Sequence, residues 1–201
     1  QSTQICGTYQ QLQNRLLLYK VLLRSFLIPL FLWLNFDGGA VMDKIMVGIS
    51  TPALWAWFYI LMFYIVYRNH GWRGLLFFLI TIAIAVGLGD MITGIFKHTG
   101  LLKNLWESFP ARLRPMHTPE LEGLVHVVKS AGRYGTVSAH AGTMSAIALM
   151  SWAVHRWMLL PMLFVALLIS YSRIYLACHF PMDIALGFTL GLMVGGVLLL
   201  L

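Results

Sequence analysis

The residues best suited to chemistry lie close together near the C-terminus, in the stretch from Ser172 to Asp183. Within these 12 residues the chain carries a serine, Arg173, His179 and an aspartate, and apolar runs flank the stretch on both sides (157–171 and 184–201). Charged side chains between two apolar runs of membrane length are unfavourable unless they lie at an interface or in a wet cavity, so by default they mark a functional site. We therefore expect the rest of the chain to bring further polar groups to this stretch.

The chemistry that these polar groups suit is phosphate chemistry. Lysine and arginine supply positive charge, and the guanidinium group offers paired donors that match phosphate oxygens. Ser138 and Ala139 stand at the expected start of a helix, where free backbone N–H groups bind anions. Two histidines, His140 and His179, would provide a nucleophile and a general acid. Asp183, four residues after His179, could hold one imidazole nitrogen so that the other points at phosphorus.

The composition predicts an integral membrane protein. Of the 201 residues, 59% are hydrophobic and only 10% are charged, far fewer than in a soluble domain of this length. The apolar runs are long and not alternating, which excludes a transmembrane barrel. The net charge of +7 suits anionic lipids or substrates. It does not indicate nucleic-acid binding, because the basic residues are scattered between the apolar runs. Cys6 and Cys178 provide neither a disulfide framework nor a paired metal motif.

The predicted fold is all-α, a polytopic membrane helix bundle. Residues 1–15 form an N-terminal tail and residues 16–201 form a single domain. Six apolar segments are long enough to span a bilayer or nearly so. The first of them carries basic residues and could instead lie along the interface. We also expect a short interfacial helix at 42–49 and a long polar loop at 98–135. The six segments are 16–36, 51–67, 74–96, 136–152, 157–178 and 181–201.

Alternation of direction along these spans brings the candidate residues to one side of the membrane. The third span ends at Lys97, the fourth begins at Ser138, and the fifth and sixth meet near His179. Asp90 lies seven residues before Lys97, on roughly the same helix face. Its carboxylate either supports the site or pairs with a neighbouring helix. The residues expected to converge are Lys97, Arg114, Ser138, His140, Arg173, His179 and Asp183.

These residues resemble the three signatures of the type-2 phosphatidic acid phosphatase family, relatives of the vanadium haloperoxidases. Ser172-Arg173, five residues, His179, three residues and Asp183 match the third signature fully. The second, usually Pro-Ser-Gly-His, is similar to the segment 137–140, which keeps serine and histidine. The first is usually Lys, six residues, Arg-Pro. Here Arg114 precedes a proline, but Lys97 lies sixteen residues earlier, so the loop is expanded and Lys103 is a second candidate.

The resemblance implies a mechanism without a metal or other cofactor. In it, His179 attacks phosphorus and forms a phosphohistidine, Asp183 orients His179, and His140 protonates the leaving oxygen. Water then hydrolyses the phosphoenzyme. The residues that hold the phosphate and stabilise the transition state are Lys97, Arg114, Ser138, Ala139 and Arg173.

The function expected on this basis is a lipid-phosphate phosphatase that acts in the bilayer on an anionic lipid. Undecaprenyl diphosphate, lipid A phosphate, phosphatidylglycerol phosphate and phosphatidate are all candidate substrates. A lipid phosphotransferase with the same phosphohistidine, and a non-enzymatic binding or transport protein, are the alternatives. Basic residues in the short turns predict that the site faces away from the cytoplasm, in a cell membrane with the site in the periplasm or outer leaflet. The sequence leaves the oligomeric state open.

Overall fold

The computed structural model describes residues 26–106, 108 and 111–200, and in them the regular structure is helical. An isolated β-bridge pairs Leu113 with Tyr134. The predicted tail and the first part of the predicted span at 16–36 lie outside the described residues. The α-helices are α2 (Ile28–Leu34), α3 (Gly39–Ile49), α4 (Ala56–Lys97), α5 (Ala139–Val154), α6 (Leu159–Tyr175) and α7 (Pro181–Leu200).

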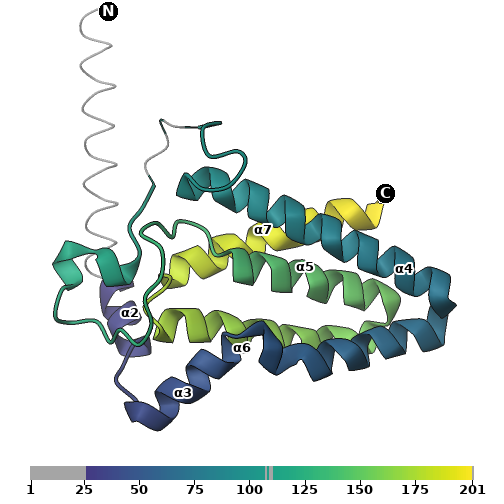
Figure 1. Cartoon of the computed structure of the whole chain (residues 1–201), viewed down its shortest axis with the longest axis horizontal. Helices are drawn as coiled ribbons and strands as arrows, with labels where there is room; N and C mark the ends of the chain where they lie inside the picture. The colour runs from purple at the N-terminus through teal and green to yellow at the C-terminus, as the bar shows by residue number, and fades with distance from the viewer. Residues whose placement is uncertain (1–25, 107, 109–110, 201) are drawn as a thin grey trace, which may run out of the picture.

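Helix α4 is a hairpin of two arms and accounts for two of the predicted spans. Gly71 interrupts it with a non-helical backbone, φ 66° and ψ −172°, a conformation open to glycine because it has no Cβ. The chain reverses direction there, and the second arm returns toward the end of the bundle where the first arm begins (Figure 1). The short connection expected between the predicted spans at 51–67 and 74–96 is therefore present, although the helical hydrogen-bonding pattern continues through it.

Among the described residues, three helical segments are long and apolar enough to cross a membrane: Pro52–Lys97, Arg156–Tyr175 and Pro181–Leu200. Helix α5 has 16 residues, about 24 Å of helix, which is short of the roughly 20 residues that a full crossing takes. Within the described residues, the first predicted span at 16–36 corresponds to helix α2, which has 7 residues. The all-helical membrane architecture is thus confirmed, while six full spans remain a prediction.

Helix α5 is the centre of the bundle, packed against α4, α6 and α7 (Figure 1). Its approach to α7 is so close that glycine is required. A Cβ at Gly187 would lie 2.5 Å from the carbonyl oxygen of Ser138, and one at Gly191 would overlap the carbonyl of Gly142. This packing brings the first turn of α5 to the first turn of α7, where the N–H of Ser138 donates to the carbonyl of Asp183 at 3.1 Å.

A polar cluster fixes α3 and the long loop to the end of α6. His126 Nε2 lies 2.8 Å from Asp43 Oδ1, and the hydroxyl of Tyr175 donates to the same oxygen at 2.7 Å. The bonds from Tyr175 and His126 lower the pKa of Asp43, which keeps this acceptor ionised. Asn35 Nδ2 donates to the carbonyl of Tyr175 at 2.6 Å. The cluster therefore fixes α3, and Ser50 directly after this helix accepts a hydrogen bond from Arg173.

Candidate active site

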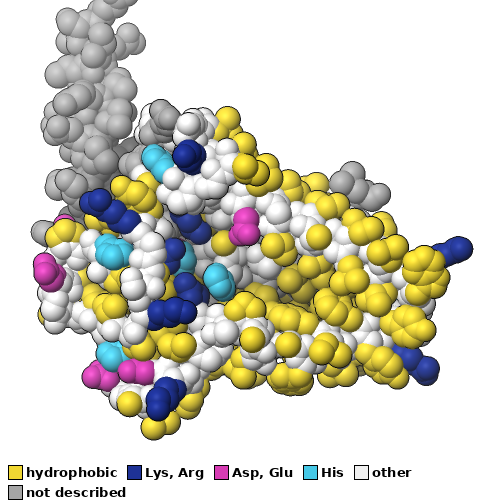
Figure 2. Space-filling view, viewed as in Figure 1, with side chains coloured by type: hydrophobic (Ala, Val, Ile, Leu, Met, Phe, Trp, Pro, Cys, Tyr) yellow, Lys and Arg dark blue, Asp and Glu magenta, His cyan; other side chains and the backbone are white. Residues whose placement is uncertain are grey.

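Histidine, lysine and arginine side chains gather in a hollow at the end of the bundle where the long loop lies (Figure 2). Along the rest of this face hydrophobic side chains predominate, and Lys or Arg side chains appear again at the opposite end. The hollow lies where α4 and α6 end and α5 and α7 begin. This is the convergence that the alternating helices predict.

His179 is buried between α6 and α7 with one ring nitrogen committed. Its Nδ1 lies 3.0 Å from the carbonyl oxygen of Gly135 and 3.5 Å from Asp183 Oδ2. A carbonyl can only accept, so Nδ1 carries the proton and Nε2 presents its lone pair. Ala177 has a left-handed backbone, φ 53°, and the N–H groups of Cys178 and His179 both donate to the carbonyl of Arg173. This tight turn fixes the imidazole with Nε2 available as a nucleophile.

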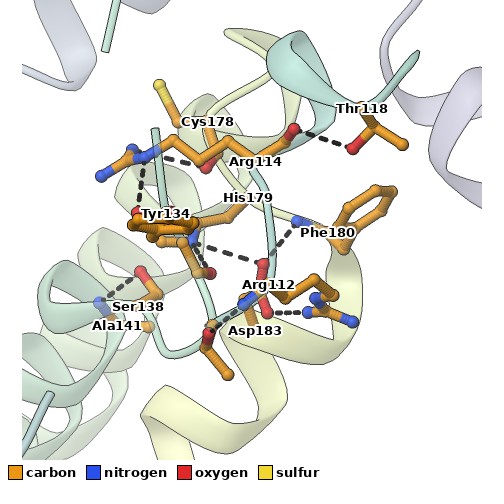
Figure 3. A network of polar contacts seen from close by, with 12 residues as sticks. Arg112, Arg114, Thr118, Tyr134, Ser138, Ala141, Cys178, His179, Phe180 and Asp183 are labelled. Atoms are coloured by element: carbon orange, nitrogen blue, oxygen red, sulfur yellow. Dashed lines mark hydrogen bonds and ion pairs between the residues drawn. The ribbon is translucent and has the colours of Figure 1, made fainter. Parts of the chain in front are cut away.

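Asp183 is fully buried, and its shorter contacts are with the turn around His179 and not with the imidazole ring itself. Its Oδ2 accepts from the N–H of Phe180 at 2.9 Å, and its Oδ1 pairs with the guanidinium of Arg112 (Figure 3). Arg112 also lies over the Phe180 ring, 5.0 Å from its centre. The carboxylate therefore anchors the backbone on which His179 stands, and the Gly135 carbonyl makes the shorter contact with the ring.

We expect Arg112→Ala to lower the free energy of unfolding by about 3 kcal/mol, because the substitution leaves the buried Asp183 carboxylate without its positively charged partner. The Asp183 side chain is only 1% exposed, so water cannot replace the lost partner. Chemical or thermal unfolding in detergent measures the change. Arg133→Ala is the matched control, since this arginine is exposed in the same loop and should change stability by no more than about 0.5 kcal/mol. Equal effects of the two substitutions would contradict the role of the buried pair.

Two parts of the long loop pair with each other to place Arg114 beside His179. The N–H of Arg114 donates to the carbonyl of Arg133 at 3.0 Å, and the N–H of Gly135 donates to the carbonyl of Arg112 at 3.0 Å. Arg114 Nε donates to the Tyr134 carbonyl, also at 3.0 Å. A Cβ at Gly135 would lie 2.7 Å from Arg114 Cγ and 3.4 Å from His179 Nδ1, so glycine is what lets the loop close on the imidazole.

The start of α5 contributes a helix N-terminus and the second histidine. Ser138 caps the helix, its Oγ accepting from the N–H of Ala141 at 3.4 Å, and it is fully buried. Ala139 and His140 form the first turn, where backbone N–H groups are free to bind an anion. His140 lies within electrostatic range of Arg173, His179, Lys97 and Arg114. The structure therefore places His140 and His179 in the same group of charged side chains.

The three cations of the site, Lys97, Arg114 and Arg173, come from three different segments: the end of α4, the long loop and α6. Lys97, the last residue of α4, interacts electrostatically with Arg114 and Arg173. Arg173 NH1 donates to Ser50 Oγ at 2.5 Å, and its buried Nε meets no acceptor among the described residues. An unpartnered buried donor beside other cations is what an anion site requires. Lys103 is exposed in the loop that follows α4.

A cavity of about 460 Å³ adjoins this cationic set and is bounded by both arms of α4, by α5 and by α6. Its polar lining includes Ser50, Asp90, His140 and Thr143, and the remainder is mostly apolar or aromatic, with Trp55, Met62, Val86 and Ile147 among the residues. The cavity joins the site to the apolar body of the bundle. A molecule with a phosphate at one end and hydrocarbon at the other fits these surroundings.

Burial lowers the pKa of His179 to about 4, although Asp183 acts in the opposite direction. The folded imidazole is thus neutral at neutral pH, as a nucleophile must be. In the unfolded chain its pKa is about 6.5, so between these values the unfolded state binds a proton that the folded state does not.

We therefore expect stability to fall as the pH is lowered from about 6.5 towards 4, and part of that loss to disappear in His179→Asn. Thermal unfolding of the two proteins in detergent across this range isolates the contribution of this imidazole, since all other titrating groups are shared. If stability fell equally with pH in wild type and in His179→Asn, the His179 imidazole would not be neutral in the folded protein.

The structure brings together the residues that the sequence singled out: Lys97, Arg114, Ser138, Ala139, His140, Arg173, His179 and Asp183. Sequence reasoning did not identify Arg112 as the partner of Asp183, nor the Gly135 carbonyl as the acceptor for His179. Arg112 could have been found, because it stands two residues before Arg114 and alternate residues of an extended segment share a face. A backbone carbonyl leaves no such signal.

Comparison with known proteins identifies a family and two relatives. The family model described as PAP2 superfamily matches residues 91–201. The lipid A 4'-phosphatase of Porphyromonas gingivalis is 28% identical over 173 residues, which cover 83% of this chain and 68% of that protein. The lipid A 4'-phosphatase of Bacteroides thetaiotaomicron is 27% identical over 168 residues, covering 81% and 70%.

The fold has also been seen in a solved structure. The crystal structure of a transmembrane PAP2 type phosphatidylglycerolphosphate phosphatase from Bacillus subtilis matches with a TM-score of 0.58 at 19% identity, over 88% of this chain and 84% of that one. At this identity the match shows a shared fold. The family model covers more than half of the chain and includes the histidines and Arg173, so the resemblance predicted from the sequence is confirmed and the chain belongs to the PAP2 superfamily.

Proposed function

We propose that the protein removes a phosphate from an anionic membrane lipid by transfer to His179 and then to water. The observation that carries this proposal is the contact between Nδ1 of His179 and the Gly135 carbonyl. It leaves Nε2 of His179 free, near Lys97, Arg114, Arg173 and the N-terminus of α5. The protein belongs to the PAP2 superfamily and is a membrane lipid-phosphate phosphatase. The mechanism proposed below is based on the contacts in its site.

In the first step, Nε2 attacks phosphorus while His140 protonates the departing lipid oxygen. Lys97, Arg114 and Arg173, with the N–H groups at the start of α5, neutralise the charge on the phosphate oxygens. Lys97 is proposed over Lys103 for this role, because Lys97 interacts electrostatically with Arg114 and Arg173. In the second step, water attacks the phosphohistidine and His140 takes its proton. The Gly135 carbonyl and Asp183 stabilise the imidazolium that forms when Nε2 becomes bonded.

The cavity beside His140 supports a lipid as the carrier of the phosphate. It is lined largely by apolar side chains of α4, α5 and α6, where hydrocarbon would lie. Because the curated relatives are lipid A 4'-phosphatases and the structural match is a phosphatidylglycerolphosphate phosphatase, lipid A and phosphatidylglycerol phosphate lead the substrate candidates.

A substrate panel on purified protein tests the proposal. Lipid A, phosphatidylglycerol phosphate, phosphatidate and undecaprenyl diphosphate are presented in detergent micelles, and inorganic phosphate is measured. Release from at least one lipid supports the phosphatase. Loss of lipid phosphate that appears only with an added acceptor lipid would instead show a phosphotransferase, and binding without turnover would show a non-enzymatic protein.

We propose further that the site faces away from the cytoplasm. The turn of α4 and the connection from α5 to α6 lie at the end of the bundle opposite the long loop (Figure 1). These two short turns carry Arg68, Arg73 and Arg156, and basic residues in short connections mark the cytoplasmic side.

An impermeant thiol reagent tests this orientation in a protein that carries Cys6→Ala and Cys178→Ala. We expect Glu122→Cys, in the exposed part of the long loop, to be labelled in cells whose outer barrier alone has been permeabilised. Arg156→Cys, at the other end, should be labelled only after the inner membrane is broken. The reverse pattern would invert the topology.

A further inference from the structure

Asp90 is a charged residue that the proposed mechanism does not use. It lies in the second arm of α4, inside one of the three segments long and apolar enough to cross a membrane, and it is exposed. The ion pairs among the described residues do not include its carboxylate. An ionisable group at such a position is unfavourable without a partner, and by default it marks a function.

Asp90 and His140 line the same cavity. They approach it from different helices, the carboxylate from α4 and the imidazole from the first turn of α5. Ser50 and Thr143 are in the lining as well, so this part of the cavity is polar while much of the rest is apolar. A group that enters between Asp90 and His140 meets hydrogen-bonding side chains before it meets the hydrocarbon surfaces.

The position of His140 decides which part of a substrate reaches Asp90. His140 is the proposed proton donor to the leaving oxygen, so the leaving group must lie against it. The phosphate itself belongs with Lys97, Arg114 and Arg173, and it would be repelled by a carboxylate. Asp90 therefore faces the part of the lipid just beyond the ester oxygen, which is the head group or backbone that remains after hydrolysis.

We infer that Asp90 selects the leaving group by accepting a hydrogen bond from a hydroxyl, amide N–H or ammonium group that a sugar or polyol head group carries close to its phosphate ester. An ionised carboxylate is an acceptor only, and its hydrogen bonds are about twice as strong as those between neutral groups. A diacylglycerol leaving group, as in phosphatidate, has no such donor and leaves the carboxylate unpaired. This inference rests on the proposed function and narrows its substrate class.

A structural role for Asp90 predicts something different. Lys97 lies seven residues further along the same helix and interacts with Asp90 electrostatically. If the Asp90 carboxylate only compensated the charge of Lys97, its removal would change the binding of the phosphate group equally for every lipid. Discrimination between leaving groups would not change when it is removed.

The experiment compares kcat/KM for lipids with and without donors, using wild type, Asp90→Ala and Asp90→Asn in the same detergent. Phosphatidylglycerol phosphate and lipid A carry donors on the leaving group, and phosphatidate does not. We expect wild type to favour at least one donor-bearing lipid over phosphatidate by about 10- to 100-fold, and Asp90→Ala to remove most of that preference while phosphatidate hydrolysis stays within about threefold. Asp90→Asn should fall between them if the donor is a neutral hydroxyl or amide, and should resemble Asp90→Ala if it is an ammonium group.

Val86→Ala is the matched control, because Val86 lines the same cavity one turn earlier in the same arm of α4. It should leave the ratio between lipids unchanged. Equal losses on all lipids in Asp90→Ala, or a wild-type preference for phosphatidate, would overturn the inference and leave the phosphatase proposal intact. If no phosphate were released from any of the lipids, both the proposed function and this inference would be contradicted.

Discussion

His179→Ala should abolish phosphate release, with a fall of about 10⁴-fold or more, while the protein remains folded in detergent. The physical reason is that Nε2 of His179 is the atom proposed to bond to phosphorus. Turnover of a lipid monophosphate by purified protein measures the loss. An activated aryl phosphate should not rescue the variant, because a better leaving group does not replace the missing nucleophile.

Two further variants make this result interpretable. His155→Ala removes an exposed histidine at the far end of the bundle and should keep full activity. His179→Asn keeps a polar side chain of similar size and should be as inactive as the alanine variant. If His179→Ala turned over the activated substrate at a rate close to wild type, water would be the direct attacking group and the covalent mechanism would be wrong.

His140→Ala should lose about 10²- to 10⁴-fold on a lipid monophosphate and recover part of that loss on an aryl phosphate. A lipid alkoxide is a poor leaving group and needs the proton of His140, whereas a phenolate leaves with less help. The two substrates are compared on one preparation of the variant. Thr143→Ala, one turn further along α5 in the same cavity, serves as the control and should lose little on either. Equal losses of His140→Ala on both substrates would mean that His140 binds phosphate and does not donate the proton.

The sequence predicts the location of this site better than its internal contacts. Long apolar runs fix where the helices lie, and their alternation puts the end of α4 beside the start of α5. Two short chemical signatures then identify Ser138, His140, Arg173, His179 and Asp183. The hairpin at Gly71 was also predictable, because a polar turn with glycine separates two apolar runs.

The parts that could not be predicted depend on pairing within the long loop. The bridge between Leu113 and Tyr134 has no periodic signal, since it involves a single residue pair in a polar segment. It nevertheless places Arg112 on Asp183 and the Gly135 carbonyl on His179. From the sequence, Asp183 was expected to orient the imidazole of His179. In the structure, Nδ1 of His179 lies 3.0 Å from the Gly135 carbonyl oxygen and 3.5 Å from Asp183 Oδ2, so the backbone carbonyl makes the shorter contact. Helix α5 has nearly the predicted length but lies two to three residues further along the chain than the predicted span at 136–152, because Ser138 caps its first turn.

The central claim is that phosphate passes through His179, and trapping the phosphoenzyme tests it most directly. Wild-type protein is mixed with a lipid monophosphate that it hydrolyses, stopped with alkali within a single turnover, and analysed by mass spectrometry of its peptides, because phosphohistidine survives base and not acid. We expect a phosphoryl group on His179 that appears before free phosphate and decays as phosphate is released, and none in His179→Ala. Free phosphate formed at the full single-turnover rate with no phosphoryl group on His179, or with one on a different residue, would contradict it.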